Sequence, residues 1–202
     1  MDTQSPIALN QFVTSHLPDG GGYTWTLASR LGQILQMAQE RFGQRDLYYT
    51  ILGVEFIDGI PQVWYPGSHS GRKDIIIQLS LECLADPMRS CYQLAHESIH
   101  LLSPTGGKAA TVLEEGLATY FSAYYMREKM AAPDWHSNMK CYAEAQAMTE
   151  ALLKIDPDAI KKLRVEQPTI SAMSADLLLR FYPALGVDLA ERLTTRFERY
   201  QD

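Results

Sequence analysis

The sequence has little of what marks several protein classes. Its 202 residues include only three cysteines, whose spacing fits neither a CxxC pair nor a disulfide framework, so we expect reduced thiols. Its strongly apolar stretches, such as Ile75–Ile77, are far shorter than the about 18 residues of a membrane helix. The formal net charge is -6 and no cluster of Lys and Arg stands out, which argues against nucleic acid as a partner.

The N-terminal residues have neither the basic segment nor the apolar segment of a secretory signal. Hydrophobic residues make up 46% of the chain and charged residues 21%, proportions that are typical of a folded globular protein. We therefore expect a single cytoplasmic domain over residues 1–202, with no membrane partner. The sequence does not indicate an oligomeric state.

The predicted elements divide this domain into four parts. Residues 1–22 form a loose lead-in that ends in three glycines. Residues 24–80 hold an amphipathic helix over 24–42, followed by a small sheet. Residues 86–130 hold two helices, and residues 131–202 form a helical C-terminal part. A helix, a small sheet and then a run of helices predict an α+β fold.

The sheet is predicted from three segments. Residues 47–57 are rich in β-branched and aromatic side chains and lead into Asp58-Gly59, a strong turn signal. Val63–Tyr65 is then a short return strand, and Asp74–Ser80 is a third strand. This order predicts a small sheet that is antiparallel in part.

Helical patterns continue from residue 86 to the C-terminus. Asp86-Pro87 is typical of a helix start, because Asp caps the free N–H groups and Pro suits the first turn. Gly106-Gly107 separates this helix from the next, which is predicted over about 108–130. Prolines delimit four further helices, predicted near 135–155, 157–165, 174–181 and 187–200.

The residues with the clearest chemistry lie on the first of these helices. His96, Glu97 and His100 form an HExxH motif. Two positions four apart on a helix differ by about 40°, so both imidazoles project from one face and suit a single tetrahedral Zn²⁺. Glu97 lies beside that face and can act on water at the metal without binding the metal itself. The alternative is a helix with two solvated or hydrogen-bonded histidines.

Two glutamates on the next helix compete to be the third ligand. Glu114 lies three residues after Thr111, so it can close a capping box at the start of the helix. Glu115 shares a helix face with small polar residues, which suits a metal cleft, and we favour it. Gly116 has no side chain, so the two helices can approach closely there.

The HExxH motif followed by Val112–Ala118 resembles the gluzincin branch of zinc metallopeptidases, in a compact, minimal form. The segment is similar to the "WLxEGxA" segment in which the glutamate before glycine is the third ligand. The resemblance implies one Zn²⁺ per chain, held by His96, His100 and Glu115, with Glu97 as the general base. It also implies a zincin-like fold, in which Asp74–Ser80 is the edge strand that binds the substrate.

The function implied is hydrolysis of a peptide bond in a peptide or protein substrate by a metal-activated water. Thr119 lies one turn after Glu115 and is placed to support the ligands. A downstream side chain should stabilise the oxyanion, and Tyr182 is our first choice. Three other candidates for that role are Tyr142, Tyr124 and His136.

Two other functions remain open. The chain can be a catalytically inactive gluzincin-like regulator or interaction protein, or a zinc hydrolase of a non-peptide amide. The intact HExxH motif favours an enzyme, because a binding module has no use for Glu97.

Overall fold

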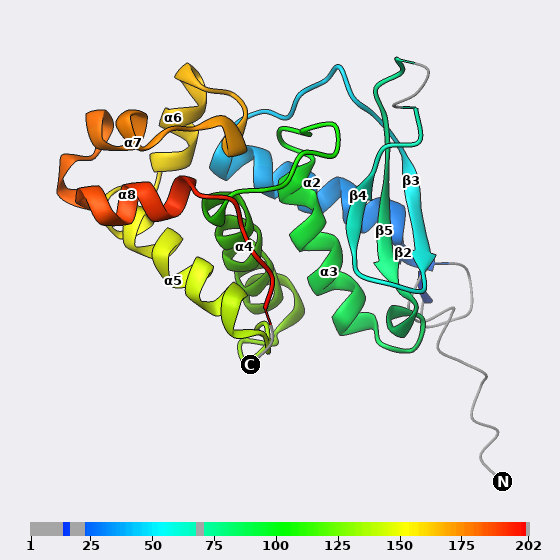
Figure 1. Ribbon diagram of the computed structural model, residues 1–202. Coiled ribbons are helices and arrows are strands. Elements are labelled where there is room, and N and C mark those ends of the chain that lie inside the picture. The colour runs from blue at the N-terminus through cyan, green and yellow to red at the C-terminus, as the bar shows by residue number, and fades with distance from the viewer. Residues whose placement is uncertain (1–13, 17–22, 68–70, 201–202) are drawn as a thin grey trace, which may run out of the picture.

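The computed structural model describes residues 14–16, 23–67 and 71–200 (Figure 1). Most of the predicted lead-in over 1–22 lies outside these ranges. The described chain is α+β, as predicted, with a small mixed sheet beside a larger set of helices. Within the described ranges, no helix has the length and apolar character needed to cross a membrane.

The first long helix is α2, Leu27–Phe42. Its apolar side chains recur at helical spacing and are buried, and Gly43 ends it with a φ of 94°, a value that favours glycine. The helix was predicted from residue 24. It starts later because β2, Tyr23–Thr26, pairs antiparallel with β1, Thr14–His16.

The sheet consists of β3 (Thr50–Ile57), β4 (Gln62–Trp64) and β5 (Asp74–Ser80) in the order β3-β5-β4. Strand β5 runs parallel to β3 and antiparallel to β4. The expected antiparallel part is therefore confirmed, but the return strand pairs with β5 and not with the strand before it.

The structure also corrects the prediction that Asp74–Ser80 is the edge strand. This strand is central, and β4 is an edge of the sheet. The reason is apolar burial: Ile75, Ile77 and Leu79 are fully buried under the helices, whereas β4 is too short and too exposed to occupy the centre.

Helices α3 (Pro87–His100) and α4 (Val112–Met130) carry the predicted site. The Asp86 side chain caps α3 by accepting from two backbone N–H groups, as its sequence predicts. Helix α4 was predicted from 108 but begins at 112, because Thr111 is its cap. Between the helices, Gly106 and Gly107 have φ values of 71° and 89° and make the turn possible.

Four helices follow, at α5 (Lys140–Ile155), α6 (Ala159–Glu166), α7 (Ala175–Phe181) and α8 (Val187–Thr194). The last ends earlier than predicted, since the chain then turns extended and Arg196 forms an antiparallel bridge with Thr111. In Figure 1 this C-terminal segment, in red, runs beside α4.

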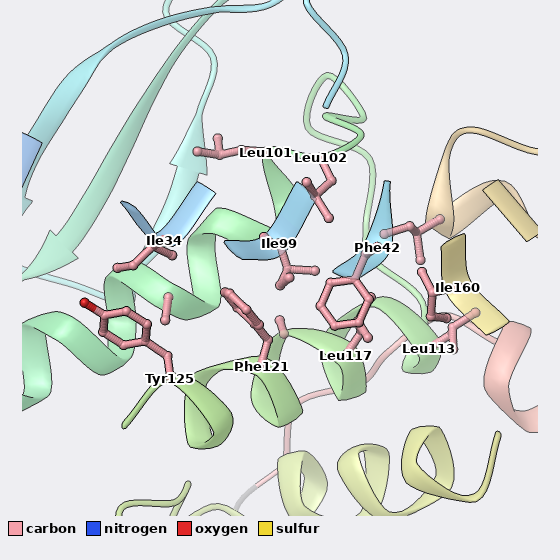
Figure 2. Close-up of a cluster of buried hydrophobic side chains, with 14 of the residues drawn as sticks. Ile34, Phe42, Ile99, Leu101, Leu102, Leu113, Leu117, Phe121, Tyr125 and Ile160 are labelled. Atoms are coloured by element: carbon pink, nitrogen blue, oxygen red, sulfur yellow. The ribbon is translucent and has the colours of Figure 1, made fainter. Parts of the chain in front are cut away.

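Helix α4 lies at the centre of the helical part. Figure 2 shows its apolar side chains meeting those of α2, α3 and α6 in one cluster. The labelled side chains are Ile34, Phe42, Ile99, Leu101, Leu102, Leu113, Leu117, Phe121, Tyr125 and Ile160. Because residues of α3 and α4 are locked in this core, the polar residues on their other faces are held in fixed positions.

The close helix approach at Gly116 differs from the prediction. A Cβ atom on Gly116 would lie 2.2 Å from the carbonyl oxygen of Ala145 on α5. The helix expected to make this close contact was α3. Because Gly116 has no side chain, α5 packs closely against α4 at this point. This contact brings the first turn of α5 close to Glu115, the next residue back along α4.

Candidate metal centre

The two histidines of the HExxH motif project from the same face of α3. Their ring centroids are 5.4 Å apart. On the opposite face of the helix, Cys91, Ala95 and Ile99 are fully buried. The amphipathic sequence thus fixes α3 in the core and directs both imidazoles away from it.

Glu115 reaches this pair from α4, as predicted. Its Oε2 lies 3.1 Å from His96 Nε2, and its Oε1 lies 3.8 Å from His100 Nε2. One ligand atom from each of His96, His100 and Glu115 can be chosen such that all lie within 4.8 Å of one another. The structure therefore brings the three predicted ligands together as a possible metal-binding group.

The donor set fits a zinc ion. Zinc bonds to nitrogen and oxygen are about 2.0–2.2 Å long, so neighbouring ligand atoms of a tetrahedral site are roughly 3.4 Å apart. The separations of 3.1 and 3.8 Å between the Glu115 oxygens and the two Nε2 atoms bracket that value. Two imidazoles and one carboxylate also leave a fourth position open, which is typical of catalytic sites.

Glu114 holds the second histidine. Its Oε1 lies 2.8 Å from His100 Nδ1, and its other oxygen accepts a hydrogen bond from the Ser171 hydroxyl. A carboxylate on Nδ1 fixes the tautomer that leaves Nε2 free for a metal. The predicted capping box is half correct, because Thr111 does accept from the Glu114 N–H but gives its own N–H to Ser171.

The charges of these groups are strongly coupled. Burial raises the pKa of Glu115, but His100 and His96 outweigh burial and lower it to about 2. Burial likewise lowers the pKa of His100, but Glu115 and Glu114 outweigh it and raise it to about 10. Without a metal, the cluster therefore holds a proton on His100 to balance its carboxylates.

Glu97 lies beside the group without joining it. Its side chain is 4% exposed and is not among the clustered ligand atoms. Burial raises its pKa above the ordinary value, an effect that the nearby His100 and His96 partly oppose. A buried carboxylate next to a metal site, with a raised pKa, is suited to accept and return a proton.

Two clefts meet at these residues. The larger, of about 670 Å³, is lined by the metal group, by the edge strand β4 and by the turn that precedes it. The smaller, of about 410 Å³, is lined by aromatic side chains and the segment between α4 and α5. His96, Glu97 and Arg199 line both clefts, so the candidate centre has open space on two sides.

Tyr142, one of the four candidates for oxyanion stabilisation, lies at the centre. Its ring packs edge-on against His96 with centroids 5.6 Å apart, and it lines the smaller cleft. Arg199 donates a hydrogen bond to its hydroxyl. Burial and the Glu115 carboxylate raise the pKa of Tyr142 to about 12, so the phenol keeps its proton at neutral pH.

The first choice, Tyr182, is not brought to the centre. Its hydroxyl donates to Asp156, which follows the last residue of α5, whereas Tyr142 lies in the first turn of that helix. Fourteen residues of helix separate these two ends by about 20 Å. Sequence distance from the HExxH motif could not distinguish the two tyrosines, because it does not show which end of α5 faces the metal group.

The other candidates divide in the same way. Tyr124 stacks on Phe121 and contacts Arg41 of α2, away from both clefts. His136 lines the smaller cleft, and its Nδ1 is 2.6 Å from the Asp134 carbonyl. Thr119 also lines that cleft but donates its hydroxyl to the backbone carbonyl of Glu115, so it supports the helix and not a ligand side chain.

Sequence reasoning missed what two residues do at the centre. Glu114 was considered as a third ligand and as a capping residue, but not as the partner of His100, although a second acceptor is expected near a metal-binding histidine. Arg199 left no signal, because it lies 84 positions after Glu115 in a segment that was predicted to be helical. Comparison of the chain with protein-family models, with curated proteins and with solved structures gives no match.

Proposed function

We propose that the protein is a zinc-dependent peptidase with a zincin-like core. The observation that carries the proposal is the meeting of His96, His100 and Glu115 from two helices, with Glu97 buried beside them. A purely structural site would need a fourth protein ligand and no such base. Within the described residues, no further histidine, cysteine or carboxylate joins the group as a fourth ligand.

The bound zinc would supply the electrophile that polarises the scissile carbonyl and activates water. Glu97 accepts the proton released when water attacks the carbonyl carbon, and then passes that proton to the leaving amine. Glu114 keeps His100 in the tautomer that presents Nε2. Tyr142, in place of Tyr182, donates a hydrogen bond from its phenolic O–H to the oxyanion, because it keeps its proton and packs against His96.

A peptide substrate suits the edge strand. One side of β4 pairs with β5 and its other side has no partner strand in the described sheet. Gln62 and Val63 of β4 line the larger cleft together with the metal group. An extended peptide can bind along this free edge by backbone hydrogen bonds, with its scissile bond beside Glu97.

The test is the Glu97→Gln variant, assayed with zinc-loaded protein on a peptide library. We expect hydrolysis to fall by about 10²–10⁴-fold while one zinc per chain is retained, because the base is lost and the ligands are not. Glu82→Gln is the matched control, since Glu82 is a carboxylate that lines the smaller cleft and pairs with Arg89. It should leave hydrolysis unchanged.

Two outcomes contradict the proposal. The first is a zinc-loaded wild type that cleaves no peptide, which favours the inactive regulator. The second is hydrolysis that Glu97→Gln leaves unchanged. Cleavage of amide or ester compounds but of no peptide would favour the non-peptide hydrolase.

A further inference from the structure

The C-terminal segment, residues 195–199, places the guanidinium group of Arg199 at the candidate centre. Two backbone hydrogen bonds hold it beside the start of α4: Val112 N–H donates to the Thr195 carbonyl over 3.0 Å, and Phe197 N–H donates to the Ala110 carbonyl over 2.9 Å. The ring of Phe197 packs on Tyr142 with centroids 4.9 Å apart. These contacts fix the segment before it reaches Arg199.

Arg199 stands where the two clefts join. It lines both of them together with His96 and Glu97, and its side chain is exposed to the cleft solvent. One of its five N–H donors is used on the Tyr142 hydroxyl. No carboxylate of the described residues lies within ion-pair distance of it, in contrast to Arg89, which lines the smaller cleft and pairs with Glu82.

A guanidinium in this position has a specific chemical use. Arg presents a planar fork that matches a carboxylate, and it stays charged at every working pH. With zinc held by Glu115, the carboxylate that still repels a substrate anion is Glu97, which lines both clefts. A fixed cation beside Glu97 offsets that repulsion, and Arg199 lines the same two clefts.

We propose that Arg199 is a specificity-determining residue that binds a carboxylate of the substrate close to the scissile bond. The inference rests on the proposed peptidase function. The carboxylate has two possible sources, the free C-terminus of a short peptide or the side chain of an internal Asp or Glu. Because Arg199 borders the centre itself, the carboxylate belongs to a residue next to the bond that is cleaved.

The test uses zinc-binding probes, so that it does not depend on turnover. The monohydroxamates of malonic, succinic and glutaric acid each carry one zinc-binding group and one carboxylate at increasing distance. Their carboxamide forms are the neutral partners. Calorimetry on zinc-loaded wild type should show at least one carboxylate form bound about tenfold to a hundredfold more tightly than its carboxamide, the range of a charged hydrogen bond.

Three variants test whether Arg199 causes the preference for the carboxylate form. Arg199→Gln should abolish it, and Arg199→Lys should keep only part of it, because Lys retains the charge but not the fork. Arg196→Gln is the matched control, since Arg196 lies in the same segment but lines neither cleft at the centre. It should keep the whole preference.

Three results overturn the inference. Wild type can bind both forms equally, Arg199→Gln can keep the preference, or Lys108→Gln can remove it instead, since Lys108 also lines the larger cleft. If Arg199 acts only by positioning Tyr142, Arg199→Gln weakens hydrolysis of all substrates equally and leaves probe binding unchanged. Zinc content is measured on the same samples: with one zinc per chain these results leave the proposed function intact, whereas absence of zinc overturns both.

The source of the carboxylate is then assigned with peptides. Matched pairs carry either a free or an amidated C-terminus, and either Glu or Gln at one internal position. A preference of kcat/KM for the free C-terminus identifies an enzyme that acts at chain ends. A preference for internal Glu identifies one that cleaves next to acidic residues. Equal cleavage of all four peptides contradicts the inference.

Discussion

Two polar clusters lie near the end of α3, one around Arg164 and one around His100, and they differ in whether their hydrogen bonds are complete. Arg164 of α6 gives all five of its N–H donors to backbone carbonyls. The acceptors are Phe42, Gly43, Gln44, Leu102 and Pro168. No N–H donor of Arg164 is left without an acceptor, and these hydrogen bonds join the end of α2 to the end of α3.

The cluster on α3 and α4 is not closed. His100 Nε2 and Glu115 Oε1 are 3.8 Å apart, beyond hydrogen-bond distance, and Glu97 adds a further buried carboxylate. Outer contacts are complete, because Glu114 and Ser171 satisfy the far side of His100. This cluster has complete contacts on its outer side and unfilled space between its ligand atoms, and it is the group at which we propose that zinc binds. The Arg164 cluster has all its donors used and stabilises the fold.

The largest loss of stability is expected when the Arg164 cluster is disrupted. Arg164→Met leaves its carbonyl acceptors without donors, so we expect the free energy of unfolding to fall by about 3–5 kcal/mol. Urea denaturation of the metal-free protein measures the loss. Lys161→Met on the same helix is the control, because Lys161 is exposed and should change stability by less than about 0.5 kcal/mol. If both variants lower the free energy of unfolding by the same amount, the Arg164 hydrogen bonds do not stabilise the fold.

The next effect concerns the contact that holds α5 against the open cluster. Gly116→Ala places a Cβ atom against the Ala145 carbonyl oxygen and 2.3 Å from Thr149 Oγ1, and should cost about 1–3 kcal/mol of stability. Gly32→Ala on α2 is the control, because no atom of the described residues lies within 4 Å of the added carbon apart from its chain neighbours and its own helix backbone. It should stabilise the protein by up to about 1 kcal/mol. A Gly116→Ala protein as stable as wild type contradicts the close approach.

The smallest effect tests the outer shell of the open cluster. Glu114→Gln removes the carboxylate on His100 Nδ1, and we expect zinc affinity to fall by about 10–100-fold without loss of stoichiometry at saturation. Competition with a chelator measures the dissociation constant. Ser171→Ala, which removes only the hydrogen bond to Glu114, should have a smaller effect in the same direction. An unchanged affinity in Glu114→Gln would show that His100 needs no support.

Local patterns predicted much of the fold. The Asp86 cap, the amphipathic helix that ends at residue 42 and the turn at Gly106-Gly107 follow from helical periodicity and short-range capping and turn rules, and the structure bears them out. The ligand group was also predictable, because HExxH fixes two positions on one helix face and Glu115 lies on the next helix.

Long-range placement could not be predicted in the same way. The position of β5 between β3 and β4, and the approach of α5 to Gly116, depend on which elements pair across the chain. For the same reason Tyr182 was preferred to Tyr142, and Arg199 was not considered. Each of these errors concerns a residue that reaches its neighbours through tertiary packing alone.

The most direct test of the open cluster is metal content by elemental mass spectrometry, on wild type and Glu115→Gln purified without a histidine tag. We expect about one zinc per chain in wild type and clearly less in the variant, because Glu115 would supply one of three ligands. Wild type that binds no zinc, even after refolding with zinc present, would contradict it, as would a variant that retains the full amount.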